Sequence, residues 1–120
     1  MTDKTVTYNG ASVALKRATV RSRLHSGIIY RKLNVDESTP DEAFQMLFNY
    51  VKFLTQATIT GDLGFKVPTY ADTSEDIQAG YEAFLDAPEA FFDAVILPLT
   101  RLEGALVEDA LQPVVDEKKV

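Results

Sequence analysis

Alternating apolar and polar residues open the chain, and this pattern predicts a β-hairpin over residues 4–16. Asn9-Gly10 separates the two alternating segments, and both residues tolerate the positive φ angles of a type I′ turn. A two-residue turn pairs Val6 with Val13 and places Tyr8 on the same face of the hairpin. An isolated hairpin is only marginally stable in water, so this apolar face must lie on helices or on another chain.

The first predicted helix covers residues 20–33, where apolar residues recur at a spacing of four. Thr19 suits the N-cap, because a threonine hydroxyl can accept a hydrogen bond from a backbone N–H of the first turn. Val20, Leu24 and Ile28 share one face of this helix, and we expect that face to lie against the core.

The second predicted helix begins at Thr39-Pro40-Asp41-Glu42, a capping box with proline at the first helical position, and runs to about Thr58. It is apolar nearly all round, and its polar residues form one narrow stripe. This pattern is typical of a central helix that neighbours cover on most sides. Residues 59–71 contain two glycines and one proline and predict a loop with a short extended piece.

Two further helices are predicted on either side of Asp86-Ala87-Pro88-Glu89. The first begins at Thr73 or Ser74. Its inward-facing residues are Ile77, Tyr81, Phe84 and Leu85. The apolar residues of the second are Phe91, Phe92, Val95, Ile96 and Leu99. Pro98 is expected to bend or end this second helix.

These elements predict an α+β fold that is mostly α, with an N-terminal β-hairpin followed by a small bundle of four to five helices. A final short helix over 102–111 completes the bundle, which covers 19–111 and forms a single domain, 1–112, together with the hairpin. The polar residues 113–120 predict a flexible tail. Since 46% of the 120 residues are hydrophobic, we expect a core of ordinary size.

Charge is divided unevenly along the chain, whose formal net charge is −6. The first 33 residues hold seven basic residues and one acidic residue, whereas the remainder holds five basic and seventeen acidic residues. Such a division favours docking within one chain or head-to-tail self-association of copies, and ordinary solvated charge is the alternative. We expect a homo-oligomer whose self-association surface consists of Val6, Tyr8, Arg17, Arg21 and Arg23.

Several classes of protein are excluded by what the sequence lacks. It has no cysteine, so it has no disulfide and no cysteine-based zinc site, which fits a reducing compartment. The longest apolar stretch, 94–99, is far shorter than the ~20 residues of a membrane-spanning helix. The first residues show no apolar run typical of a signal peptide. We therefore expect a soluble protein that stays where it is made.

The sequence also shows no pattern typical of catalysis or cofactor binding. His25 is its single histidine, and neither a nucleophile nor a second metal ligand is indicated beside it. Most acidic pairs fall in the first turns of predicted helices, where the helix dipole stabilises them. Gly61-Asp62-Leu63-Gly64 lacks the lysine and the strand–helix context of a phosphate-binding loop. We expect no enzyme, no metal and no cofactor.

Two kinds of partner are indicated by residue clusters. The basic cluster from Lys16 to Arg23 could contact nucleic acid, but the acidic remainder would repel a phosphate backbone, so this partner is disfavoured. The aromatic residues of the later helices could all be core, or some could line an open groove that accepts an amphipathic helix. The candidate partner-binding residues are Tyr81, Phe84, Phe91, Phe92 and Ile96.

Three segments of the sequence match one known pattern in layout. Residues 6–24 form a hairpin followed by a basic residue, a small residue and Thr-Val-Arg, with which a helix begins. Residues 53–62 contain a threonine-rich helix end followed by a glycine. Residues 81–92 form a helix, a proline-containing turn and a second helix. In these features the chain resembles the tail assembly chaperones of long-tailed bacteriophages.

The resemblance implies a non-enzymatic protein that acts in the host cytoplasm and is absent from the finished virion. It would bind the long helical tape measure protein, keep it soluble and help to recruit subunits of the tail tube protein. Two alternatives come from other classes of protein. One is a structural virion protein, such as a tail completion or head–tail connector protein, and the other is a small DNA-binding regulator that uses Arg17, Arg21 and Arg23.

Overall fold

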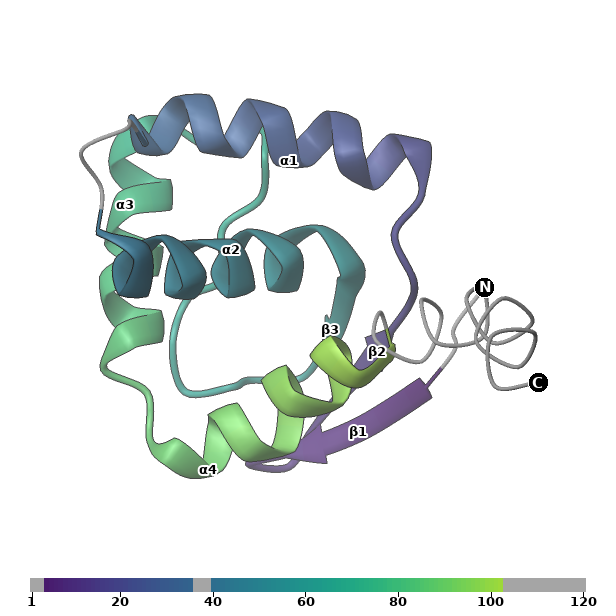
Figure 1. Ribbon diagram of the computed structural model, residues 1–120. Helices are drawn as coiled ribbons and strands as arrows, with labels where there is room; N and C mark the ends of the chain where they lie inside the picture. The colour runs from purple at the N-terminus through teal and green to yellow at the C-terminus, as the bar shows by residue number, and fades with distance from the viewer. Residues whose placement is uncertain (1–3, 36–39, 103–120) are drawn as a thin grey trace, which may run out of the picture.

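A computed structural model describes residues 4–35 and 40–102 (Figure 1). Its elements in chain order are β1 (Lys4–Tyr8), β2 (Ala11–Leu15), α1 (Val20–Leu33), α2 (Asp41–Gln56), β3 (Ala57–Thr60), α3 (Ser74–Leu85), α4 (Glu89–Phe91) and the π-helical segment η1 (Phe92–Ile96). The predicted fold class, an N-terminal hairpin with a small helical bundle, is confirmed. The helix expected up to residue 111 and the tail expected over 113–120 lie outside the described residues.

The hairpin has the predicted register and packs on helices of its own chain. Val6 lies opposite Val13, and the turn residues Asn9 and Gly10 have φ angles of 52° and 80°. The apolar face of β1 lies on the helix formed by α4 and η1, where the Tyr8 ring meets a phenylalanine ring edge-on. Figure 1 shows α4 and its continuation running along the hairpin. The hairpin therefore needs no second chain to cover it.

A third strand replaces the predicted end of the second helix. Helix α2 ends at Gln56, about two residues earlier than predicted, and residues 57–60 pair with β2 as the antiparallel strand β3. Three β-branched residues in this stretch favour a strand. Gln56 holds the junction between α2 and β3 through two hydrogen bonds to Lys16. Its side-chain amide donates to the Lys16 backbone carbonyl at 3.0 Å, and its backbone carbonyl accepts from the Lys16 N–H at 3.0 Å.

Helix α1 has the predicted cap but not the predicted orientation. The Thr19 hydroxyl accepts from the Ser22 N–H at 3.1 Å, and the Ser22 hydroxyl accepts from the Thr19 N–H at 2.7 Å. The residues expected to face the core do not: Val20 is 90% exposed and Leu24 is 63% exposed. The prediction for this face was wrong.

Small polar residues explain the orientation of α1. Its buried residues are Ser22 and Ile29, and Ile28 is only half-buried. The Ser26 hydroxyl reaches the Thr55 hydroxyl of α2 at 3.4 Å, so this small polar side chain lies at the contact between the two helices. The helix thus packs on α2 through a face that a hydrophobic pattern does not mark.

Helix α2 is covered on most sides, as predicted, only in its second half, where every residue over 49–56 is buried or half-buried. It begins one residue later than predicted, with Pro40 in the N-cap position and no side-chain cap, while Thr39 lies outside the described residues. Phe44 and Phe48 are exposed. The buried residues, which lie toward α1, α3 and the sheet, are Leu47, Tyr50, Val51, Phe53 and Gln56.

Helix α3 follows its prediction except at its last residue. The Thr73 hydroxyl caps it by accepting from the Asp76 N–H at 3.1 Å, and Ile77 and Phe84 are buried as expected. Leu85, expected to face inward, is 45% exposed. It is the last residue of the helix, and Figure 1 shows the chain turning from the end of α3 toward α4.

The last described helix does not end at Pro98. Residues 92–96 form a π-helical turn, in which the Leu97 N–H donates to the Phe92 carbonyl, and helical backbone continues through residues 97–102. Proline has no N–H to donate within a helix, and π-helical turns are rare and occur mostly as single turns inside α-helices. This turn lies directly beside the candidate site described below.

Candidate functional site

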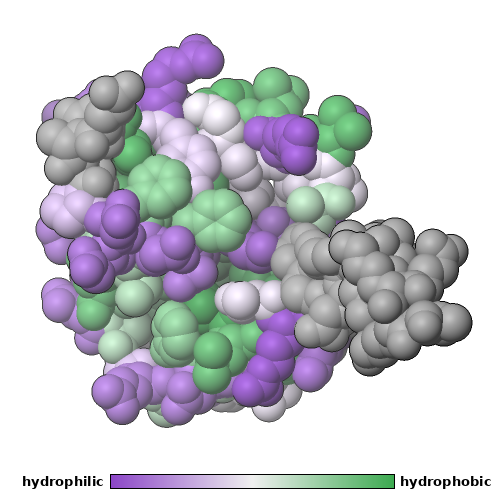
Figure 2. Space-filling model, viewed as in Figure 1, coloured by the Kyte–Doolittle hydropathy of each residue, from purple (hydrophilic) through white to green (hydrophobic). Residues whose placement is uncertain are grey.

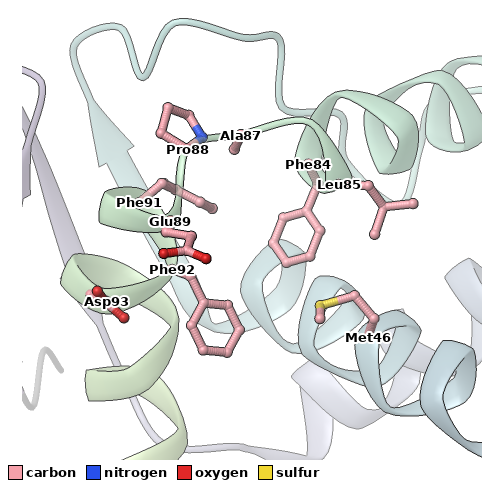
Figure 3. Close-up of a pocket in the computed structure, with 9 residues that line it drawn as sticks. All are labelled: Met46, Phe84, Leu85, Ala87, Pro88, Glu89, Phe91, Phe92 and Asp93. Carbon is pink, nitrogen blue, oxygen red and sulfur yellow. The ribbon is translucent and has the colours of Figure 1, made fainter.

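An apolar cavity of about 470 Å³ opens between α2 and the helix that starts at α4 (Figure 3). We call it the α2–α4 groove. Its apolar lining comes from Met46, Phe84, Leu85, Ala87, Pro88, Phe91 and Phe92. Its charged lining comes from Glu89 and Asp93. The volume lies within the ~300–1,000 Å³ that ligand-binding pockets occupy.

Helices α2 and α3 and the continuous helix formed by α4 and η1 position the groove. Met46 comes from α2, Leu85 from the end of α3, and Phe92 from the start of η1. In Figure 3 the side chains of Met46, Phe84 and Phe92 converge on the cavity from these different elements. In the view of Figure 2, apolar side chains gather between α2 and α4, with hydrophilic residues along the lower edge. The groove is therefore a shaped apolar surface rather than a single exposed residue.

The structure separates the predicted partner-binding residues into two groups. Phe84, Phe91 and Phe92 line the groove, although only Phe92 is more than marginally exposed. Ile96 is sealed in the core and does not line it. The half-buried Tyr81 lies elsewhere, with its ring 5.2 Å from the Tyr50 ring. Burial raises the pKa of Tyr81, and the nearby negative charge of Glu82 adds to this effect.

Sequence reasoning missed the residues that make the groove accessible. Leu85 was assigned to the core because its spacing matched the inward face of α3, and Met46 was assigned to a helix covered on most sides. The proline-containing turn between α3 and α4 is the signal that could have identified them. Because the chain turns here, α3 ends at Leu85 and the next helix begins only at Glu89. Leu85 and Met46 then both line the groove.

A second exposed surface lies on α1, and we call it the α1 patch. It is lined by Val20, Arg21, Leu24, His25 and Tyr70. The His25 ring stacks on the Tyr70 ring with centroids 3.8 Å apart and planes 10° apart, so this histidine is part of the surface packing. The patch combines exposed apolar side chains with a basic residue.

The predicted self-association residues do not form one surface. Val6 and Tyr8 are half-buried against helices of the same chain. Arg21 lies in the α1 patch, whereas Arg23 lines a separate cavity of about 320 Å³ between α1 and α2. Residues two apart on a helix point to different sides of it, so Arg21 and Arg23 cannot face one partner surface together. Arg21 lies beside the exposed Val20 and Leu24, whereas Arg23 lines its cavity together with the exposed Phe48.

Within residues 4–35 and 40–102, no group of three or more histidine, aspartate or glutamate side chains is placed to hold a metal ion. Across the same ranges, the helices all lack the length and apolar character that crossing a bilayer requires. The lining of the α2–α4 groove offers apolar contact bordered by two carboxylates.

Comparison of the chain with protein-family models, with curated proteins and with solved structures finds no match.

Proposed function

We propose that the protein is a non-enzymatic chaperone of phage tail assembly whose α2–α4 groove binds apolar helical stripes of the tape measure protein. In this role it keeps the tape measure protein soluble in the host cytoplasm and helps to recruit tail tube subunits. The observation that supports the proposal is the open apolar groove, in which Leu85 and Phe92 remain accessible beside a well-packed core. The resemblance of the sequence to tail assembly chaperones is the reason for proposing the tape measure protein as the client.

The groove suits a client that must be held and later released. Grooves of this kind accept amphipathic helices, whose apolar residues at positions i, i+4 and i+7 fill the cavity. A tape measure protein exposes such stripes before the tail tube covers them. Contacts that bury only a few apolar side chains dissociate readily, because little apolar area is removed from water.

The test of the groove is co-expression with the product of the neighbouring large, helix-rich open reading frame. We expect the wild-type protein to bring that product into the soluble fraction and the Leu85→Asp variant to fail, because an apolar client would remove the new carboxylate from water without pairing it. Phe48→Asp is the matched control, since Phe48 is also 45% exposed but lies outside the groove. Equal solubilisation by both variants would contradict the proposal.

Localisation of the protein in a phage infection separates the proposal from its main alternative. A chaperone is found in the lysate but not in purified virions. Recovery of the protein in stoichiometric amounts from purified virions would instead favour a tail completion or head–tail connector protein.

Self-association through the α1 patch is the second part of the proposal. The Leu24 side chain is 63% exposed beside Arg21, and much of the remaining surface is acidic, so copies can attract one another. We expect light scattering at low salt to show multimers for the wild-type protein and monomers for the Arg21→Glu variant, with high salt dissociating the multimers. A wild-type protein that stays monomeric at every concentration and ionic strength would refute this part.

A further inference from the structure

Negative charge is confined to one side of the α2–α4 groove. Seven of its nine lining residues are apolar, and the remaining two, Glu89 and Asp93, are both acidic. Both carboxylates come from the helix that starts at α4, and both residues are exposed. The adjacent turn adds the exposed Asp86, whereas the lining includes no basic residue. The groove therefore offers an apolar floor beside an acidic ridge.

We propose that the occupant of this groove is a basic amphipathic helix of a partner protein. Its apolar side chains would lie on Phe92 and Leu85, and its lysine or arginine side chains would pair with Glu89 and Asp93. This inference rests on the proposed function. It adds that the client helices are positively charged, which the function itself does not require.

The spacing of the two carboxylates supports a helical partner. Glu89 and Asp93 are four residues apart on continuous helical backbone, so they lie on the same side of that helix. Side chains four apart on an α-helical partner are separated by roughly 5–6 Å and likewise lie on one side of their helix. Two basic residues at positions i and i+4 of the partner can thus face both carboxylates at once.

The charge also selects among the possible occupants. Residues 103–120 of the chain itself contain five acidic residues and two basic residues, the latter both at its end, so they would mainly bring carboxylates against carboxylates. The α1 patch of a second copy has a suitable charge but offers only Val20 and Leu24, because Ile28, the next residue at this spacing, is half-buried. A helix of another protein can supply a third apolar residue at i+7 and fill the groove more completely.

Two synthetic peptides of about 18 residues, long enough to populate a helix, serve as probes. Both carry the same leucine stripe at i, i+4, i+7 and i+11, with lysine flanking the stripe in one peptide and glutamate in the other. Their binding to the full-length protein is measured by fluorescence anisotropy. We expect the lysine peptide to bind roughly three- to thirtyfold more tightly at low salt, because it gains two partly exposed charge pairs. This preference should shrink at high salt.

Charge reversal locates the effect. The double variant Glu89→Lys/Asp93→Lys is expected to prefer the glutamate peptide, and the neutral variant Glu89→Gln/Asp93→Asn is expected to show little preference. The matched control is Glu75→Lys/Asp76→Lys, which changes the net charge equally in another helix first turn, away from the groove. This control should keep the preference of the wild-type protein for lysine. Thermal unfolding followed by circular dichroism verifies that each variant is folded.

The outcomes separate the charge inference from the proposed function. If the two peptides bind equally well and Leu85→Asp weakens the binding of both, the charge inference is overturned and the groove remains a binding site. No binding of either peptide, or binding that Leu85→Asp does not change, would contradict the proposed function as well. Dissociation of multimers by the lysine peptide would show that a second copy occupies the groove, which would overturn the assignment to a partner protein.

Discussion

Replacing Phe91 by alanine is expected to destabilise the protein by about 3–5 kcal/mol, a large part of the ~5–15 kcal/mol that stabilises a typical domain. The Phe91 ring is 2% exposed and lies within 6 Å of four other rings. The rings and their centroid distances are Tyr8 at 5.5 Å, Phe53 at 5.5 Å, Phe65 at 5.2 Å and Phe84 at 5.9 Å. Removing this ring leaves a cavity where the hairpin, α2 and the loop after β3 meet.

Phe92→Ala is the matched control for this prediction. Phe92 is the next residue along the same helix, but it is half-buried and lines the α2–α4 groove. We expect its loss to cost about 1 kcal/mol of stability, since truncating the half-buried Phe92 ring removes less buried apolar area than truncating Phe91. Urea unfolding followed by circular dichroism measures both variants. Equal destabilisation by the two substitutions would show that Phe91 does not have the central role in the core assigned to it.

The second large effect is expected at Gly80, where an added methyl group has no space. A Cβ atom at this position would lie 2.5 Å from the Tyr50 hydroxyl oxygen and 2.6 Å from Cδ of Pro68. The Tyr50 hydroxyl donates to the Ile77 carbonyl at 2.8 Å, and burial, with the negative charge of Asp72 as a second cause, raises the pKa of Tyr50. We expect Gly80→Ala to destabilise the protein by about 2–4 kcal/mol through crowding and loss of this hydrogen bond.

Gly27→Ala is the corresponding control, because nothing lies within 4 Å of a Cβ atom at Gly27. Alanine has the higher helix propensity, so this variant should be more stable than the wild-type protein by about 0.5–1 kcal/mol. Thermal unfolding of both variants tests the pair. If Gly80→Ala unfolds at or above the wild-type temperature, the close packing of α3 on Tyr50 and Pro68 is refuted.

A double variant examines the cause of the effect at Gly80. Adding Tyr50→Phe removes the hydroxyl oxygen that the new methyl group would meet. The double variant should therefore lose less stability than the sum of the two single variants. Simple additivity would mean that Pro68 alone causes the crowding.

Local patterns determined much of the fold. The Asn9-Gly10 turn set the register of the hairpin, since few residue pairs tolerate two successive positive φ angles. Thr19 and Thr73 marked the starts of α1 and α3 because each caps its helix with its own hydroxyl. These features depend on residues within a few positions of one another, so the sequence contains all the information that they require.

Other features depended on neighbours distant in sequence. The hydrophobic pattern assigned Val20, Leu24 and Leu85 to the core, yet all three are exposed. A side chain is buried only if another element covers it, and the sequence does not specify where that element lies. The strand β3 was missed for the same reason, because four residues become a strand here by pairing with β2.

The sequence by itself determined the fold class, the hairpin, the caps of α1 and α3, the uneven distribution of charge and a set of aromatic residues that includes the floor of the groove. Only the tertiary structure decided which of those aromatics are sealed and which remain accessible. Phe91 and Phe92 are adjacent and chemically identical, and they differ because α2, α3 and the hairpin surround one of them and leave a groove beside the other. Accessibility is a property of the packed elements, and the candidate site lies where Pro88 begins a new helix after α3 and beside α2.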